Sequence, residues 1–225
     1  MHLKRISGSA AVVLVTAAAL ATGPLPSASA SPAGHAAFSR VEYSDGEPRN
    51  ARLSIPKIGI HRLKVIAYRG KTDDAPGTRI QNRGIAASSH GPQGGTGPGG
   101  IGNYQVAGHR TSHGGVFGRT PSLDRGDKVF VDSGRWRYVY RIIKTRWVSF
   151  RSAESLRKQR AEVPGKPWKK ATRGFITVST CATPEDRARG NYWTDRFGNP
   201  EHRIDKIGIL DKRVERPPRH HDGRR

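Results

Sequence analysis

The single cysteine of this chain, Cys181, is its strongest candidate for covalent chemistry. It follows residues 175–180, an apolar and β-branched stretch that predicts a strand, and a strand end holds a nucleophile on rigid backbone beside a cleft. The thiolate is the form that attacks, so such a site needs a partner that handles the proton. A buried, inert thiol is the alternative for any lone cysteine. The sequence around Cys181 favours the nucleophile.

Histidine is the side chain best suited to exchange that proton near neutral pH. Of the nine histidines in the chain, four lie where a folded site is expected: His90, His109, His113 and His202. His109 ends a strand-like segment, residues 104–108, which gives it a rigid platform. His90 and His113 lie in Gly-rich stretches, where placement is less defined. We therefore expect His109 to be the partner of Cys181.

An acyl transfer also needs donors for the oxyanion that develops in the transition state. Arginine suits this role because its guanidinium stays charged and carries several N–H groups. Arg203 opens the predicted strand 204–210 and is the preferred residue. The segment before it offers Arg187, Arg189 and Arg196, of which Arg196 is the second choice. For each arginine, a solvated surface charge is the alternative.

Short β signals recur through the middle of the chain and supply the elements that must position these groups. The sequence predicts strands at residues 53–55, 63–68, 103–107, 128–132, 136–147, 175–180 and 204–210. Ser133-Gly134 predicts a hairpin between two of them. One helix is predicted at Ser152–Arg160, with Ser152 as its N-cap. With 27 glycines and 15 prolines for turns, this pattern predicts an all-β fold, a closed barrel or sandwich with one or two short helices.

The first thirty residues predict export from the cytoplasm. Lys4 and Arg5 precede an apolar run, Ala10 to Ala21, which is shorter than the ~20 residues that a membrane-spanning helix needs. Ala28-Ser29-Ala30 resembles a cleavage site, so residues 1–30 read as a secretory signal peptide and the protein as extracellular or associated with the cell envelope. An uncleaved N-terminal membrane anchor is the alternative.

The remaining chain divides by composition into a folded part with polar extensions. We expect a flexible spacer at residues 31–50, a catalytic domain at 51–212 and a disordered basic tail at 213–225. The formal net charge of +22 predicts affinity for anionic polymers, such as acidic wall polymers or an anionic membrane surface. No basic helix or RNA-binding signature is present, so we expect no nucleic-acid partner.

Four motifs, in the same order along the chain, resemble those of the sortase family. Thr177-Val178-Ser179-Thr180-Cys181 resembles the sortase signature T-L-x-T-C. The segment from Val106 to Gly114 is similar to A-G-H-R-T-x-H-G of the actinobacterial class E sortases. Leu53 to Ile60 resembles their first strand, L-x-I-P-x-(L/I)-G-(L/I), and Asp124 to Lys128 resembles their L-x-x-G-D turn. The resemblance spans residues 51–212.

This resemblance implies an eight-stranded β-barrel with Cys181, His109 and an arginine, preferably Arg203, at one end. In that family the cysteine attacks the Thr–Gly carbonyl of a C-terminal sorting motif, LPxTG-like or, in class E, LAxTG-like. The protonated histidine supplies the proton for the departing glycine amine. An amine of a peptidoglycan precursor or a pilin lysine then resolves the thioester. Surface proteins bearing the motif are the implied partners, and His113 takes a structural role.

The resemblance implies no cofactor, although some sortases bind Ca²⁺. The chain departs from class E after Cys181, because a segment that class E keeps short reaches Arg203 only after 22 positions. Arg203 to Ile207 resembles instead the start of the corresponding strand in class F. Two other functions stay open from the sequence: a secreted thiol peptidase that hydrolyses its acyl-enzyme, and a non-catalytic basic protein that binds anionic wall polymers.

Overall fold

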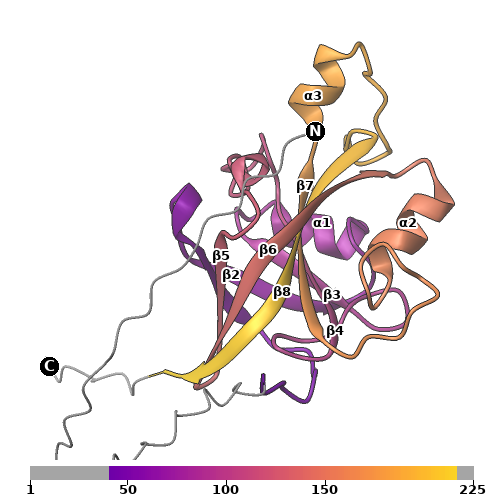
Figure 1. Ribbon diagram of the computed structural model, residues 1–225. Helices are drawn as coiled ribbons and strands as arrows, with labels where there is room; N and C mark the ends of the chain where they lie inside the picture. Colours follow the sequence, from indigo (N-terminus) through magenta and orange to yellow (C-terminus); the bar gives the residue numbers. More distant parts are fainter. Residues whose placement is uncertain (1–40, 217–225) are drawn as a thin grey trace, which may run out of the picture. The chain divides into compact units, whose positions relative to one another are not determined.

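Eight β-strands close into a barrel in the computed structural model, which describes residues 41–216 (Figure 1). The strands are β1 (Ala51–Ile55), β2 (Ile60–Arg69), β3 (Ala86–His90), β4 (Gly102–Ala107), β5 (Lys128–Ser133), β6 (Trp136–Ser149), β7 (Gly174–Cys181) and β8 (His202–Glu215). Short helices lie in the connections: η1 (Pro56–Ile58), α1 (Ala75–Gln81), η2 (Thr120–Ser122), α2 (Ala153–Arg160) and α3 (Thr183–Ala188). The predicted all-β barrel is confirmed.

The strand order around the barrel is β1-β2-β3-β4-β7-β8-β6-β5, and β5 closes on β1. β2 pairs with β3, and β4 with β7, in parallel, whereas the other neighbours are antiparallel. Because β7 is parallel to β4 and antiparallel to β8, the ends of β4 and β7 and the start of β8 meet at one end of the barrel. Figure 1 shows α3 beyond the end of β7 at this position.

The predicted hairpin and helix are both confirmed. β5 and β6 pair antiparallel around a turn in which Gly134 has a φ of 56°, a conformation that favours glycine. Tyr140 and Ile142 of β6 point into the core, as the alternation of apolar and basic residues predicts. Helix α2 begins where Ser152 Oγ accepts a hydrogen bond of 3.1 Å from the backbone N–H of Ser155.

Besides the 3-10 helices η1 and η2, three elements escaped prediction from the sequence: β3, α1 and α3. β3 has the sequence Ala-Ala-Ser-Ser-His, whose small residues have little intrinsic β preference, and it forms because β2 pairs along its whole length. α1 contains Pro76 and Gly77, which by themselves indicate a turn, and the Asp74 carboxylate caps it by accepting from the Gly77 N–H at 2.9 Å. The described residues thus contain three short α-helices where the sequence predicted one or two.

The folded part is longer at both ends than the sequence predicted. Val41 and Tyr43, expected in the flexible spacer, pack against the hydrophobic core, and Ser44 Oγ donates to the carbonyl of Pro98 at 2.7 Å. β8 continues to Glu215, three residues into the expected tail, because β6 pairs with it throughout. The expected signal peptide, residues 31–40 and residues 217–225 lie outside the described residues. No helix within 41–216 is long and apolar enough to cross a membrane.

A buried polar layer lies between α2 and the outer face of β4, β7 and β8, because its residues alternate along the strands with those that face the barrel core. Gln159 of α2 donates through Nε2 to both carboxylate oxygens of Asp205 at 3.2 Å. Thr177 Oγ1 donates to Asn103 Oδ1 at 2.8 Å. Asp205 is only 1% exposed, and this burial raises its pKa from 3.8 to about 6. The layer ties α2 to the strands that carry the site.

We expect Asp205→Asn to change the pH dependence of stability. A carboxyl whose pKa is raised on folding stabilises the fold below its unfolded pKa, and this contribution is lost as the pH rises through the folded pKa. The window is therefore pH 4 to 7, and a shift of about two units corresponds to roughly 3 kcal/mol.

Urea unfolding measures this effect as the difference between wild type and variant, which cancels other titrating groups. The free energy of unfolding of the wild type should fall relative to that of the variant by up to about 3 kcal/mol between pH 4 and pH 7. A constant difference across that range would mean that Asp205 ionises as it does in the unfolded chain.

Candidate active site

Cys181 is the last residue of β7 and lies directly opposite Arg203 in the antiparallel pairing with β8. Behind it, Ile176 and Val178 are fully buried and fix β7 in the core. Cys181 lines a cleft of about 350 Å³ at this end of the barrel. The structure therefore places Cys181 where the sequence predicted, at a rigid strand end beside a cleft.

Backbone contacts on both sides hold His109, which lies two residues after β4. The Gly108 N–H donates to the carbonyl of Ser179 at 3.2 Å, and the Phe117 N–H donates to the carbonyl of His109 at 3.0 Å. A Cβ at Gly108 would lie 2.8 Å from the Phe117 ring, so only glycine fits there. His109 lines the same cleft as Cys181.

The imidazole of His109 contacts a side chain from α1 and a second histidine. Its Nε2 lies 2.7 Å from Asn82 Oδ1, and its ring stacks on that of His113 with 4.9 Å between the centroids. Because an amide oxygen only accepts, Nε2 carries a proton and Nδ1 is the free nitrogen of the neutral ring. Burial, followed by the nearby His113, lowers the pKa of His109. The resting imidazole is therefore neutral near pH 7.

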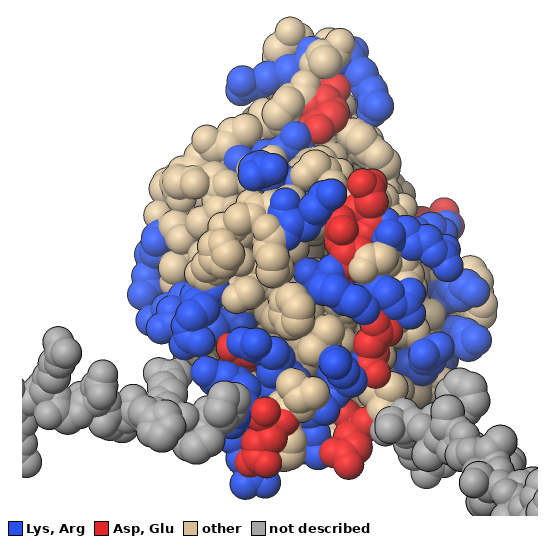
Figure 2. All heavy atoms as spheres, turned by 60° about the vertical axis from the view of Figure 1, so that its left-hand side comes forward, with Lys and Arg blue, Asp and Glu red and all other residues tan. Residues whose placement is uncertain are grey.

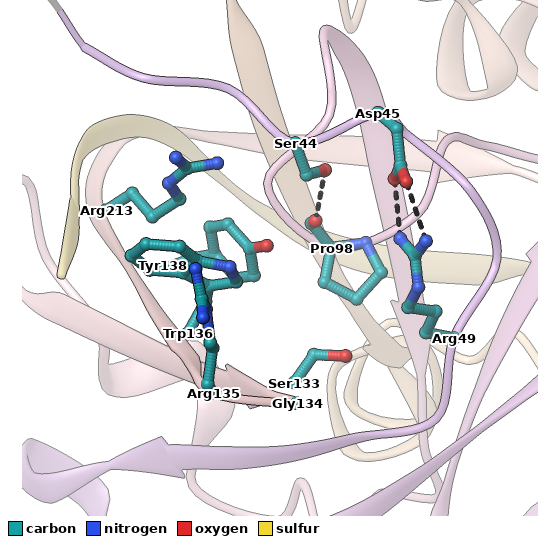
Figure 3. A pocket seen from close by; sticks show the side chains of 10 residues that line it. All are labelled: Ser44, Asp45, Arg49, Pro98, Ser133, Gly134, Arg135, Trp136, Tyr138 and Arg213. Carbon is teal, nitrogen blue, oxygen red and sulfur yellow. Dashed lines mark hydrogen bonds and ion pairs between the residues drawn. The ribbon is translucent and has the colours of Figure 1, made fainter. Parts of the chain in front are cut away.

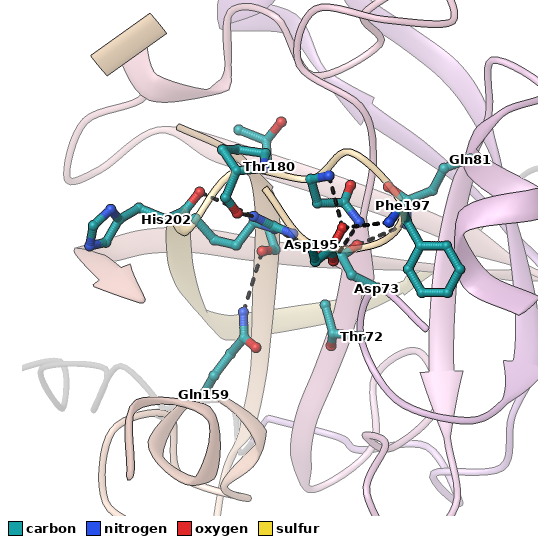
Figure 4. A network of polar contacts seen from close by, with 12 residues as sticks. Thr72, Asp73, Gln81, Gln159, Thr180, Asp195, Phe197 and His202 are labelled. Atoms are coloured by element: carbon teal, nitrogen blue, oxygen red, sulfur yellow. Dashed lines mark hydrogen bonds and ion pairs between the residues drawn. The ribbon is translucent and has the colours of Figure 1, made fainter. Parts of the chain in front are cut away.

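Arg203 is only 1% exposed, and its guanidinium is held in place by several contacts. Nε donates to Asp73 Oδ2 at 2.7 Å, and Nη1 donates to the carbonyl of Pro200 at 2.6 Å. The guanidinium lies 4.0 Å from the centroid of the Phe150 ring. Its Nη2 is buried and has no hydrogen-bond partner among the described residues. Figure 4 shows the polar contacts around Asp73, Gln81 and His202.

Arg196, the alternative arginine, is exposed and stacks on Phe197 of the same loop at 4.8 Å. Arg187 lines the cleft, whereas Arg189 stacks on Trp147 on the outer face. Only Arg203 combines burial with a register position opposite Cys181. The geometry thus favours Arg203 over the other three arginines.

The thiol of Cys181 is not activated in the resting site. Burial raises its pKa to about 11; Asp73 and Asp195 act in the same direction, and Arg203 opposes them. At neutral pH the resting pair is therefore a neutral thiol and a neutral imidazole. A thiol and an imidazole can together carry out nucleophilic attack at a carbonyl with proton transfer between them. The guanidinium of Arg203 can donate hydrogen bonds to the oxyanion that forms.

The other histidines with a predicted place in the fold have different roles. His113 lines the cleft with His109 but is exposed at its rim. His90 ends β3, where the sequence indicated a loop. His202 Nδ1 lies 2.7 Å from the buried carboxylate of Asp186 in α3. This pair fastens α3 to the start of β8.

Three residues of the site escaped prediction from the sequence. Asp73 and Asn82 contact Arg203 and His109 from the two ends of α1, and no local pattern links partners that are 130 and 27 positions apart. Arg110 donates to the carbonyl of Cys181 at 3.3 Å and binds both carboxylate oxygens of Glu185 in α3, at 3.0 and 2.9 Å. The position of Arg110 directly after His109 was the available signal.

The segment between Cys181 and Arg203, expected to be a long loop, contains α3 and a tight turn. In the turn, Asp195 Oδ1 accepts from the N–H groups of Phe197 and Asn199, each at 2.9 Å. This turn brings Phe197, Asn199 and Pro200 to the cleft wall. The segment between Cys181 and Arg203, which is longer than in class E sortases, thus forms one side of the cleft.

A second hollow, of about 340 Å³, lies at the opposite end of the barrel, beside the β5–β6 turn (Figure 3). Its lining includes Arg49, Trp136, Tyr138 and Arg213 and contains no cysteine or histidine. Within residues 41–216, no group of three or more His, Cys, Asp or Glu side chains is arranged to hold a metal ion. Of these two hollows, only the cleft of Cys181 is thus lined by cysteine and histidine side chains.

Solved sortases have the same fold as this chain at low sequence identity. The SrtA sortase from Actinomyces oris is 20% identical over 82% of this chain and 89% of that chain, with a TM-score of 0.56. Sortase E from Streptomyces avermitilis is 22% identical over 77% and 93%, with a TM-score of 0.53. The SrtF sortase from Corynebacterium diphtheriae is 17% identical over 82% and 94%, with a TM-score of 0.54.

The sortase domain model matches residues 53–197, more than half of the chain. This range includes His109 and Cys181 and ends before Arg203. No curated protein sequence matches the chain. Sortases are enzymes of the cell envelope. On the family match and the shared barrel, this chain belongs to the sortase family of cysteine transpeptidases, which act on sorting motifs.

Proposed function

We propose that this chain is a class E-like sortase that cleaves an LAxTG- or LPxTG-like sorting motif between Thr and Gly. It transfers the acyl group to an amine of a peptidoglycan precursor or a pilin. The observation that carries this proposal is that His109 and Cys181 line one cleft while Arg203 lies opposite Cys181 in the pairing of β7 with β8. The class rests on the segment from Val106 to Gly114, in which His113 stacks on His109.

In the first step, Cys181 Sγ attacks the threonine carbonyl and its proton passes to His109. The carbonyl oxygen becomes an oxyanion, and Nη2 of Arg203 is the donor left to stabilise it. Charge balances, because the proton lost by the thiol is held by the imidazolium while the negative charge moves to oxygen. Arg203 is already charged and in place, so it need not reorganise during the reaction.

In the second step, the oxyanion collapses and the Thr–Gly bond breaks. His109 returns its proton to the departing glycine amine, which leaves a thioester on Cys181 and a neutral imidazole. The second amine attacks this thioester, loses a proton to His109, and the proton is returned to the Cys181 thiolate. The acyl group thus ends on a new amide, and the enzyme regains its resting protonation.

Two further parts of the proposal concern location and partners. We propose that the chain is exported by residues 1–30, with surface proteins bearing the sorting motif as its substrates. We also propose that its positive charge binds an anionic wall polymer. On the face drawn in Figure 2, Lys and Arg side chains are spread over much of the surface, with Asp and Glu side chains among them.

The residues from Arg157 to Arg173, which run from the second half of α2 to the start of β7, form a densely basic stretch. They contain seven Lys and Arg residues and one acidic residue, Glu162. Trp168 lies among them with 75% of its surface exposed. A locally dense charge of this kind is the site that a polyanion would contact.

A product assay tests the transferase against a hydrolase. With an LAxTG peptide and a glycine or diaminopimelate-type amine, we expect a new amide and a thioester adduct on the intact protein. Cys181→Ala should abolish both, because it removes the nucleophile. Free acid as the sole product, even at high amine concentration, would mean that the enzyme is a thiol peptidase. Turnover by Cys181→Ala would mean that the nucleophile lies elsewhere.

Single substitutions test the proton carrier and the oxyanion donor. We expect His109→Ala to lower kcat by about 10²- to 10⁴-fold, because it removes the general acid and base. Arg203→Ala should cost about 10²- to 10³-fold, the loss typical of an oxyanion donor. Arg196→Ala is the matched control and should leave kcat nearly unchanged. The reverse order of the two arginine variants would assign the role to Arg196.

Charge substitutions test the anionic partner. Combined replacement of Lys166, Lys169 and Lys170 by Gln should weaken sedimentation with a glycerol-phosphate polymer, and added salt should weaken it for wild type. Replacement of Lys57, Lys64 and Lys212 by Gln removes the same charge elsewhere and should have less effect. Equal losses would assign binding to overall charge, and preferential binding to anionic lipid vesicles would name a membrane surface instead.

A further inference from the structure

Asp73 meets Arg203 from a segment far away in the sequence. Its Oδ2 accepts from Arg203 Nε at 2.7 Å, and its Oδ1 accepts from Gln81 Nε2 at 3.0 Å. The side chain is 8% exposed, so the ion pair is shielded from water. Asp73 is labelled beside Gln81 and Asp195 in Figure 4. The pair links the β2–α1 connection to the start of strand β8.

The backbone of Asp73 is held in a left-handed conformation, with a φ of 58°. For a residue other than glycine this conformation is disfavoured, and it persists where surrounding contacts determine it. Arg203 and Gln81 are those contacts. The surrounding structure therefore fixes the position of the Asp73 carboxylate against Arg203.

The contacts of Arg203 leave a single nitrogen free. Asp73 accepts from Nε, while the carbonyls of Pro200 and His202 accept from Nη1 at 2.6 and 3.3 Å. Phe150 covers the face of the guanidinium. Nη2 has no partner within residues 41–216 although it is buried, and an unpaired buried donor is costly unless a ligand completes it.

We propose that Asp73 is a positioning residue: its carboxylate orients Arg203 so that Nη2 faces the reacting carbonyl, and its charge balances the buried guanidinium beside Cys181. This inference rests on the proposed function, because the oxyanion of the reacting substrate is the group to which Nη2 would donate. Without Asp73, the guanidinium would be a buried cation without an anionic partner, an arrangement that strongly destabilises proteins.

The charge of Asp73 has a separate effect on the nucleophile. The charged groups that act on Cys181 are Arg203 and Arg110, which lower its pKa, and Asp73 and Asp195, which raise it. Removing the charge of Asp73 should therefore lower the pKa of Cys181. His109 responds to Asp73 too: the carboxylate raises its pKa, against burial, His113 and Arg203, which lower it.

The test compares Asp73→Asn with Asp132→Asn in the full chain. Asp132 is a matched control, because it is a 3% exposed aspartate that binds Arg137 through two hydrogen bonds, of 2.7 and 2.9 Å, at the opposite end of the barrel. Both variants should lower Tm. Asp73→Asn alone should lower kcat for peptide cleavage by at least about 10-fold, with a smaller change in KM.

Iodoacetamide alkylation of Cys181, followed by mass spectrometry across pH 6 to 11, supplies a readout that needs no peptide. Asp73→Asn should be alkylated several-fold faster than wild type at pH 8, whereas Asp132→Asn should match wild type. Asp73→Glu keeps the charge but moves the carboxylate, so its alkylation should stay close to wild type while its kcat falls. Equal alkylation and equal kcat losses in Asp73→Asn and Asp132→Asn would overturn the proposal.

A second variant covers the case in which Asp73→Asn does not fold. Gln81→Ala removes the other partner of Asp73 and should lower kcat while leaving alkylation unchanged; an unchanged kcat would contradict the positioning role. Different results would contradict the proposed function and the proposed role of Asp73. Wild-type enzyme without peptide turnover contradicts the proposed function, whereas an Asp73→Asn variant with wild-type alkylation contradicts the role of Asp73.

Discussion

The site depends on the place of β7 between a parallel neighbour, β4, and an antiparallel neighbour, β8. This arrangement alone brings the end of two strands and the start of a third to the same end of the barrel. Cys181, His109 and Arg203 then converge although up to 94 positions separate them in the chain. Each side chain has a rigid support, and a catalytic group needs this support to stay within a fraction of an ångström of its working position.

Burying a guanidinium at that end requires the other parts of the site. Arg203 needs an anion, and α1 with its preceding loop supplies Asp73. The same segment then reaches His109 through Asn82, so one short element contacts two of the three proposed catalytic side chains. Arg110 performs the corresponding task for α3, which it joins to the carbonyl of Cys181 through Glu185. The cleft is thus framed by helices that the barrel does not need for its own closure.

The sequence predicted the parts of this site that local patterns encode. The strand ends at Cys181 and Arg203, the hairpin at Gly134 and the cap at Ser152 each depend on residues adjacent in the chain, and the structure contains all of them. β3 could not be predicted, because its small residues become a strand only when β2 lies beside them. Asp73 was missed for a related reason, since it gains its role from a partner 130 positions away.

A protonated resting thiol is compatible with the nucleophilic role proposed for Cys181. The thiolate is the form that oxidants attack, so a Cys181 with a pKa near 11 is protected until substrate arrives. Ionising such a thiol at pH 7 costs roughly 5 kcal/mol, which the reaction must offset. In the proposed mechanism, transfer of the proton to His109, instead of to water, keeps both charges within the cleft, where they attract each other strongly. In the same mechanism, the unpartnered Nη2 of Arg203 gains a partner as the oxyanion forms, so that its stabilising contact arises in the transition state and not in the resting enzyme.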